Sequence, residues 1–180
     1  MGNRFTVHGT RADEDCLYLT NGGTDVFFDV LTLAGSAIAE SDWERNLVLH
    51  FADGHRHSRG FDGFDLSALP WTADWPAEKA FLLALLGKAM TRHGWHLLTY
   101  DPPYAPDSLR RYRAMADGLA APVPVRRRPR RWGDWRVPPP AEFLERCPAH
   151  GIYQGELGCR LCDPEIQPPP WRAGRDARKT

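Results

Sequence analysis

One stretch decides how the C-terminal part of this chain folds: Cys147-Pro148-Ala149-His150-Gly151 followed by Gly158-Cys159-Arg160-Leu161-Cys162. Its cysteines and histidine follow the spacing C-x2-H-x8-C-x2-C. A gap of two residues lets both members of a pair point at one metal ion from a tight turn. Three thiolates and one imidazole complete a tetrahedral shell, which is the closed Cys3His arrangement of a structural zinc site. We therefore predict a structural Zn²⁺ bound by Cys147, His150, Cys159 and Cys162.

The motif resembles those of the zinc-ribbon and zinc-knuckle families over residues 147–162, although Asp163 stands where the commonest knuckle has a glycine. Residues 152–157, between the two pairs, are long enough for one miniature hairpin. Zinc binding, worth on the order of 10 kcal/mol at neutral pH, would fold a segment too small for a core of its own. Two alternatives stay open: ordinary thiols or disulfides, and an iron or redox role for Cys159 and Cys162.

A basic, tryptophan-bearing stretch precedes the zinc motif. Five arginines within six positions make a strong local field, and two tryptophans nearby offer stacking faces, which suits phosphates and unpaired bases. The candidate contact residues for nucleic acid or another partner are Arg126, Arg127, Arg128, Arg130, Arg131, Trp132 and Trp135. Two other interpretations remain: the arginines dock on acidic groups of the same chain, or the stretch is a solvated linker whose tryptophans pack onto the preceding domain.

The charge of the chain is divided along its length. The 180 residues carry 23 basic and 23 acidic side chains, for a net charge of zero. Residues 1–120 hold 11 Lys or Arg against 16 Asp or Glu, whereas residues 121–180 hold 12 against 7. This shift places a boundary near Ala120. We predict an acidic domain over 1–120, a Pro/Arg/Trp-rich connector over 121–141, a zinc-binding module over 142–167 and a basic tail over 168–180.

Hydrophobic patterning predicts an α+β domain with a small, mainly antiparallel sheet and three helices. Strands are expected at 5–7 and 95–100, and a β-hairpin from 16–20 and 25–30 around Asn21-Gly22-Gly23. Helices are expected from 41 to 53 behind a Ser41/Glu44 capping box, from 76 to 93 and from 106 to 119. Cys16 is expected to be a buried thiol.

Asp101-Pro102-Pro103-Tyr104 resembles the DPPY motif of amino-methyltransferases. The resemblance implies that the aspartate side chain and a proline carbonyl hold a target amine while the aromatic ring stacks on the base. The stretch 28–36 resembles their cofactor loop but lacks its second glycine. Asp-Pro-Pro also ends strands for steric reasons alone, which favours a turn without catalytic meaning.

A second set of metal-ligand residue types surrounds the end of the expected helix 41–53: His50, Asp53, His55, His57, Asp62 and Asp65. Imidazoles and carboxylates at this density could hold a metal ion. The spacing matches no fixed motif, and a polar loop with His50 partly packed is the favoured interpretation.

The N-terminus lacks the apolar core of a signal peptide, and no apolar run approaches the length of a membrane span, so we expect a cytoplasmic protein without a membrane partner. The leading hypothesis is a non-catalytic, zinc-stabilised binding or adaptor protein that engages a macromolecular partner, with nucleic acid a candidate for the basic arm. Alternatives are a protein inhibitor, immunity or assembly partner acting through the acidic domain, and an enzyme of the amino-methyltransferase or His-cluster type.

Overall fold

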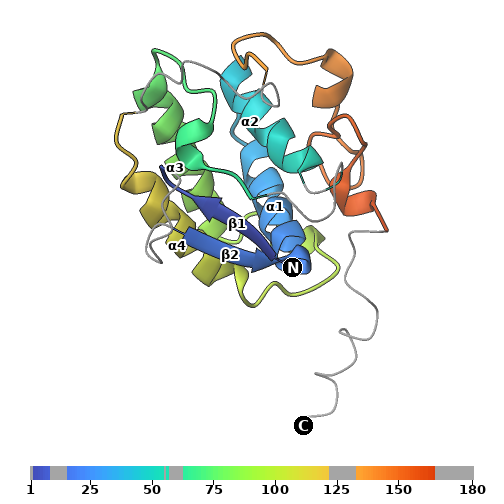
Figure 1. Ribbon diagram of the computed structural model, residues 1–180. Coiled ribbons are helices and arrows are strands. Elements are labelled where there is room, and N and C mark those ends of the chain that lie inside the picture. The colour runs from blue at the N-terminus through green and yellow to red at the C-terminus, as the bar shows by residue number, and fades with distance from the viewer. Residues whose placement is uncertain (1, 9–15, 55, 57–62, 122–132, 165–180) are drawn as a thin grey trace.

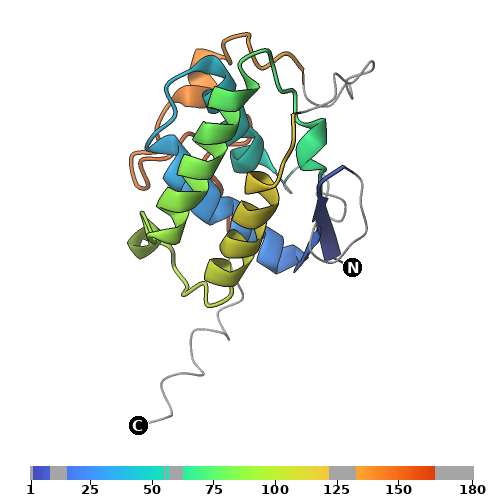
Figure 2. The ribbon, with the colours of Figure 1, turned by 90° about the vertical axis from the view of Figure 1, so that its left-hand side faces the viewer.

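The apolar run from Val26 to Ala34 lies at the centre of the molecule. It belongs to α1 (Asn21–Ser36), which has buried residues on every side, as expected for a helix that is apolar all round. The computed structural model describes residues 2–8, 16–54, 56, 63–121 and 133–164. Three further helices pack against α1 (Figure 1): α2 (Asp42–Asp53), α3 (Trp75–Met90) and α4 (Ala105–Asp117). Figure 2 shows α3 and α4 side by side.

The sheet is smaller than the sequence predicts. It consists of β1 (Gly2–Thr6) and β2 (Cys16–Thr20), paired antiparallel with Arg4 opposite Tyr18. The second strand of the predicted hairpin, 25–30, is wrong, because these residues lie in α1. Thr20 caps that helix: its hydroxyl accepts a hydrogen bond from the Gly23 backbone N–H at 3.1 Å. The polar residues after Thr20 therefore form the first turn of a helix.

The chain has four α-helices in the described part and not the three predicted, and α1 is the additional one. The Ser41/Glu44 capping box of α2 is confirmed, with both reciprocal hydrogen bonds present. The predicted helices at 76–93 and 106–119 correspond to α3 and α4 with small shifts of their ends. The predicted strand at 95–100 is wrong: a short 3-10 helix, Trp95–Leu97, follows Gly94 and buries the Trp95 side chain.

Aromatic side chains join the sheet to the helices. The Phe5 ring of β1 lies 5.5 Å from the Phe27 ring and 5.9 Å from the Tyr112 ring of α4, in edge-to-face contacts. At Gly35 the helices α1 and α2 approach so closely that a Cβ atom would lie 2.5 Å from a methyl group of Val48. Cys16 is fully buried, as predicted.

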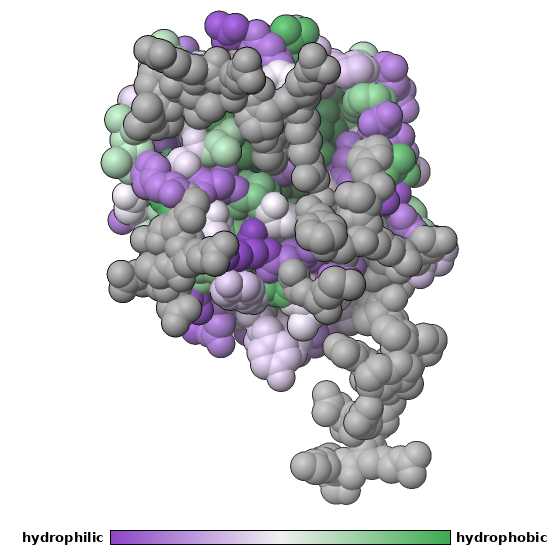
Figure 3. Space-filling model, in the orientation of Figure 1, coloured by the Kyte–Doolittle hydropathy of each residue, from purple (hydrophilic) through white to green (hydrophobic). Residues whose placement is uncertain are grey.

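The large apolar side chains that the described residues expose come from different parts of the chain: Tyr18, Met90, Tyr104, Val137 and Leu157. Figure 3 shows one face, on which hydrophilic residues surround small separate apolar areas. Among the described helices, none has the length and apolar character that crossing a membrane requires.

Residues 133–164 lie along α1 and α2 (Figure 1). Trp135 and Tyr153 from this segment are part of the main hydrophobic core, and the Asn46 side chain of α2 donates hydrogen bonds to the Trp135 and Val137 carbonyls at 3.2 and 2.9 Å. The predicted boundaries of connector, module and tail stay a prediction. Residues 122–132 and 165–180 lie outside the described residues.

Candidate metal centre

Two tight turns carry the four predicted ligands. In the first, the Gly151 N–H donates to the Cys147 carbonyl at 2.7 Å, and the Cys147 N–H donates to the Ile152 carbonyl at 2.9 Å. An antiparallel bridge between Arg146 and Tyr153 closes this turn, so the pairing encloses the first ligand pair and does not form within 152–157. In the second turn, Arg160–Cys162 form a single 3-10 turn, in which the Cys162 N–H donates to the Cys159 carbonyl at 3.1 Å.

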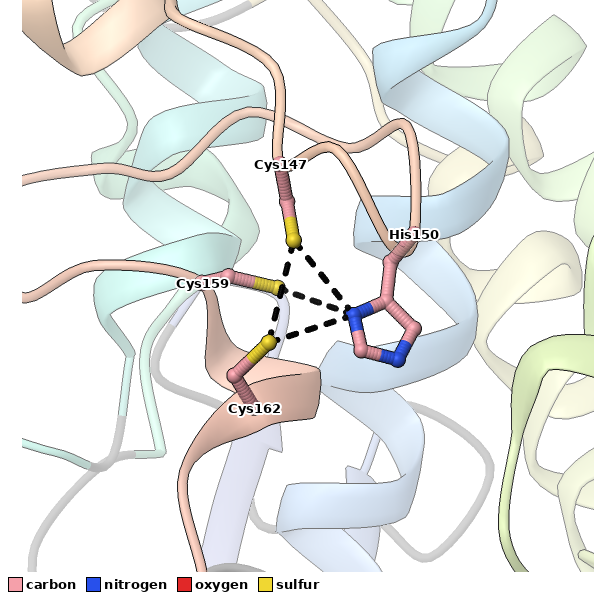
Figure 4. Close-up of side chains that lie close together, drawn as sticks. All are labelled: Cys147, His150, Cys159 and Cys162. Atoms are coloured by element: carbon pink, nitrogen blue, oxygen red, sulfur yellow. Dashed lines mark hydrogen bonds between the residues drawn. The ribbon is translucent and has the colours of Figure 1, made fainter.

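The turns bring the four ligand atoms together (Figure 4). The Nδ1 atom of His150 lies 3.5 Å from the Sγ atoms of Cys147 and Cys159, and 3.4 Å from that of Cys162. The Sγ atoms of Cys147 and Cys162 are 3.7 Å apart. All four atoms lie within 4.8 Å of one another, and this is the one such group that the described part of the chain contains. These residues are therefore positioned to hold a metal ion.

The separations can be compared with those around a tetrahedral zinc ion. Bonds of about 2.3 Å to sulfur and about 2.05 Å to nitrogen put two sulfur ligands about 3.8 Å apart and a sulfur about 3.6 Å from a nitrogen. The S···S distance of 3.7 Å and the S···N distances of 3.4 to 3.5 Å are close to these values. The donor set is compatible with zinc, with Nδ1 as the imidazole ligand.

The thiols differ in their proton affinity. Burial raises the pKa of the Cys159 thiol to about 12, and it also raises that of Cys162. At Cys147 burial acts in the same direction, but hydrogen bonds to the thiolate from His150 and from nearby backbone N–H groups outweigh it and bring the pKa to about 6. Without a metal ion, Cys147 is therefore the site of a single negative charge near neutral pH.

The surroundings of the cluster are apolar on one side. Leu33 of α1 packs with Ile152, Leu161 and the buried ligands Cys147 and Cys159 in a small hydrophobic cluster. Cys162 is exposed and His150 is half-buried. One edge of the cluster thus rests on α1, and the other faces solvent.

Hydrogen bonds to Ser36 of α1 and Asp53 of α2 hold the segment that carries the ligands. The Arg146 guanidinium donates to the Ser36 carbonyl at 2.6 Å, and the Ser36 hydroxyl accepts from the Tyr153 N–H at 3.1 Å. The Asp53 carboxylate accepts from the N–H groups of Glu156 and Leu157 at 3.1 and 3.2 Å.

Gly155 is required for the contact with Asp53. It has a φ of +68°, and a Cβ atom there would lie 2.4 Å from an Asp53 carboxylate oxygen. The chain can therefore approach the end of α2 this closely only with glycine at this position.

No protein-family model, curated protein or solved structure matches this chain.

Two arginines near the ligands were not among the predicted site residues. Arg160, between Cys159 and Cys162, is fully buried, and its Nε donates to the Asp29 carboxylate at 2.5 Å. Arg56 donates to the Gly158 and Leu157 carbonyls, both at 2.7 Å, and pairs with Asp163. Asp29 carried a signal: a charged residue within the apolar run 26–34 must find a partner when that run is buried.

The predicted partner-contact residues are described only at one position. Arg126, Arg127, Arg128, Arg130, Arg131 and Trp132 lie outside the described residues. Trp135 is buried, with its ring 5.5 Å from that of Trp43. This placement corresponds to the interpretation in which the tryptophan packs onto the preceding domain.

The described members of the histidine-rich set do not form a ligand group. The His50 ring packs against the rings of Phe28 and Phe64. Asp53 accepts the hydrogen bonds from the ligand-bearing segment, and Asp65 caps a 3-10 turn by accepting from the Ser67 N–H at 2.8 Å. His55, His57 and Asp62 lie outside the described residues.

The two stretches that resemble amino-methyltransferase motifs do not have the local structure that the resemblance implies. Residues 28–36 lie in the helix α1 and not in a loop, and the sheet of the described part has two antiparallel strands. Asp101 and Tyr104 are exposed, and Tyr104 lies at the start of α4. The residues before the motif, which were predicted as a strand, include the 3-10 turn Trp95–Leu97.

Proposed function

We propose that this protein is a non-catalytic, zinc-stabilised binding protein that engages a macromolecular partner. Cys147, His150, Cys159 and Cys162 would bind one structural Zn²⁺. Its role would be to fold residues 142–164 and hold them along α1 and α2. The basic arm at 126–131 joins two described parts of the chain, residues 63–121 and 133–164.

One observation carries the structural role of the metal. The ligand atoms of Cys147, His150, Cys159 and Cys162 lie within 4.8 Å of one another, a grouping compatible with a tetrahedral zinc ion. A catalytic zinc site keeps one position for water or substrate, whereas a closed set of four protein ligands leaves none. This supports a stabilising role over a catalytic one.

The arginine-rich arm favours nucleic acid as the partner. Five arginines between 126 and 131, followed by Arg172, Arg175, Arg178 and Lys179, offer many phosphate contacts. Trp132 is assigned as the stacking side chain of the arm, because Trp135 is buried. A binding mode of this kind follows backbone charge and unpaired bases, with little sequence preference.

The test is a titration of a fluorescent single-stranded oligonucleotide with the full chain at several salt concentrations. We expect the affinity to fall by a factor of roughly 300 between 50 and 200 mM salt if about six phosphates are contacted, since the slope for a single strand is about −0.7 per phosphate. Changing Arg126, Arg127, Arg128, Arg130 and Arg131 together to alanine should abolish binding, and changing them to lysine should preserve most of it.

The exposed arginines of α4 provide the control, because Arg110→Ala and Arg111→Ala remove positive charge outside the arm. Those variants should bind as the wild type does. An affinity that does not change with salt, or an alanine-substituted arm that still binds, would contradict nucleic-acid binding through this arm. Capture of a basic protein by the full chain with the alanine-substituted arm would instead favour a protein partner that binds the acidic part.

A further inference from the structure

The Arg160 side chain fills a specific site in the helical core. Its Nη1 donates to three carbonyl oxygens at the end of α2, those of Phe51, Ala52 and Gly54, at 2.7, 3.0 and 3.2 Å. Its Nε donates to Asp29 at 2.5 Å, and its Nη2 donates to the Asp25 carbonyl at 3.2 Å. We call this set of acceptors, namely Asp25, Asp29 and the carbonyls of Phe51, Ala52 and Gly54, the guanidinium socket.

The socket suits a planar, five-donor cation and not a simple positive charge. Acceptors surround the guanidinium on three of its nitrogens, and the Phe28 ring lies 5.7 Å from its central carbon. The α2 carbonyls include ones that the helix itself leaves unpaired, and a cation there opposes the negative end of the helix dipole. Arg160 therefore satisfies hydrogen-bond acceptors of α1 and α2 at once.

Leaving the socket empty would be costly. Asp29 is 1% exposed, so its carboxylate depends on Arg160 and on the Tyr100 hydroxyl, which also donates to it. Burial and the nearby Asp29 raise the pKa of Tyr100, so this hydroxyl stays protonated and remains a neutral donor to the carboxylate. A neutral hydroxyl alone does not replace the charge of a guanidinium.

Two of the candidate metal ligands lie on either side of Arg160. Cys159 and Cys162 flank it within one 3-10 turn, and the side chains of these cysteines point to the metal cluster while that of Arg160 points into the core. Arg56 also holds this turn, through the Leu157 and Gly158 carbonyls and the ion pair with Asp163. A bound metal would add its bonds to Cys159 and Cys162 to these contacts.

We propose that metal binding and the packing of α1 on α2 are energetically coupled through Arg160 in the guanidinium socket. The inference rests on the proposed metal site and adds to it a control of the helical core by metal occupancy. Loss of the metal would loosen the turn, withdraw the guanidinium and leave Asp29 buried without its cation. Coupling between two sites is reciprocal: the factor by which metal binding favours the filled socket equals the factor by which the filled socket strengthens metal binding. A substitution that weakens the socket should therefore weaken metal binding.

The test measures zinc affinity by competition with a chromophoric chelator in wild type and in Asp29→Asn. The substituted side chain belongs to α1, keeps its shape and is not a metal ligand. We expect the Kd for zinc to rise by roughly tenfold or more, within the usual range of coupling between sites. Asp107→Asn is the matched control: it also removes a carboxylate paired with an arginine, but at an exposed position, and should leave the Kd unchanged.

A folded Asp29→Asn protein that binds zinc with wild-type affinity would overturn the coupling. If this variant does not fold, Tyr100→Phe decides, because it removes only the hydroxyl that donates to Asp29. Its Kd should rise severalfold, and an unchanged Kd would again overturn the inference. Failure of the wild type itself to take up zinc would be distinct, since it would contradict the metal site and with it the proposed function.

Discussion

At the scale of single residues, the same short turn carries two kinds of chemistry. Cys159 and Cys162 present thiols to the candidate metal site, while Arg160 between them reaches a buried carboxylate of α1. The ligands were predictable because their spacing depends only on local geometry. The partner of Arg160 was not, because Asp29 is 131 positions away in the sequence and only the packed helices bring it there.

The thiol protonation states predict how zinc binding depends on pH. Cys159, with a pKa of about 12, and Cys162, whose pKa is also raised, are protonated at pH 7.5, whereas Cys147, with a pKa of about 6, is a thiolate. Since zinc binds thiolates, its uptake should release about two protons at pH 7.5 from a metal-free segment that keeps this fold, and nearly three from one that is unfolded, where each thiol has a pKa of about 8.5. Zinc affinity therefore falls as the pH falls.

Calorimetry in buffers of different ionisation enthalpy measures this proton release directly. As a control, Cys16→Ser removes a buried thiol that lies in β2, outside the ligand group, and should leave the number of released protons unchanged. Release of no protons at pH 7.5 would show that the three thiols are not the ligands.

At the scale of elements, the helix α1 shows where local pattern is insufficient. Val26-Phe27-Phe28 and Thr32 have high strand preference, and a short apolar run between polar residues fits a buried strand as well as a buried helix. Tertiary packing decides, because only a helix presents apolar side chains in all directions to α2, α3 and α4. The amphipathic helices α2 and α4 were predictable, since one apolar stripe fixes their period.

The N-cap of α1 gives a prediction that separates the helix from the hairpin. Thr20→Ala removes the hydroxyl that accepts from the Gly23 N–H, so the free energy of unfolding should fall by about 1 kcal/mol. Thr20→Ser retains the hydroxyl and should restore most of it. Urea denaturation followed by circular dichroism measures both. Equal stability of Thr20→Ala and the wild type would argue against a cap at this position.

At the scale of the whole molecule, the acidic part (1–120) and the basic part (121–180) contact each other through hydrogen bonds and ion pairs. Arg146 and Arg160, from the basic part, bind Ser36, Asp29 and the end of α2, and Arg56 of the acidic part pairs with Asp163. Composition could predict the division but not these contacts, which depend on the position of each helix end. The candidate metal site lies in the segment that contacts both α1 and α2, so a metal ion bound there would stabilise contacts between distant parts of the chain.

X-ray absorption at the zinc edge, on protein purified without chelator, tests the central claim most directly. One zinc ion per chain is predicted, with three sulfur ligands at about 2.3 Å and one nitrogen ligand at about 2.0 to 2.1 Å. His150→Ala should remove the nitrogen contribution and leave the sulfur shell. A chain with less than about half an equivalent of zinc, or a shell that His150→Ala leaves unchanged, would contradict the Cys3His site and the account built on it.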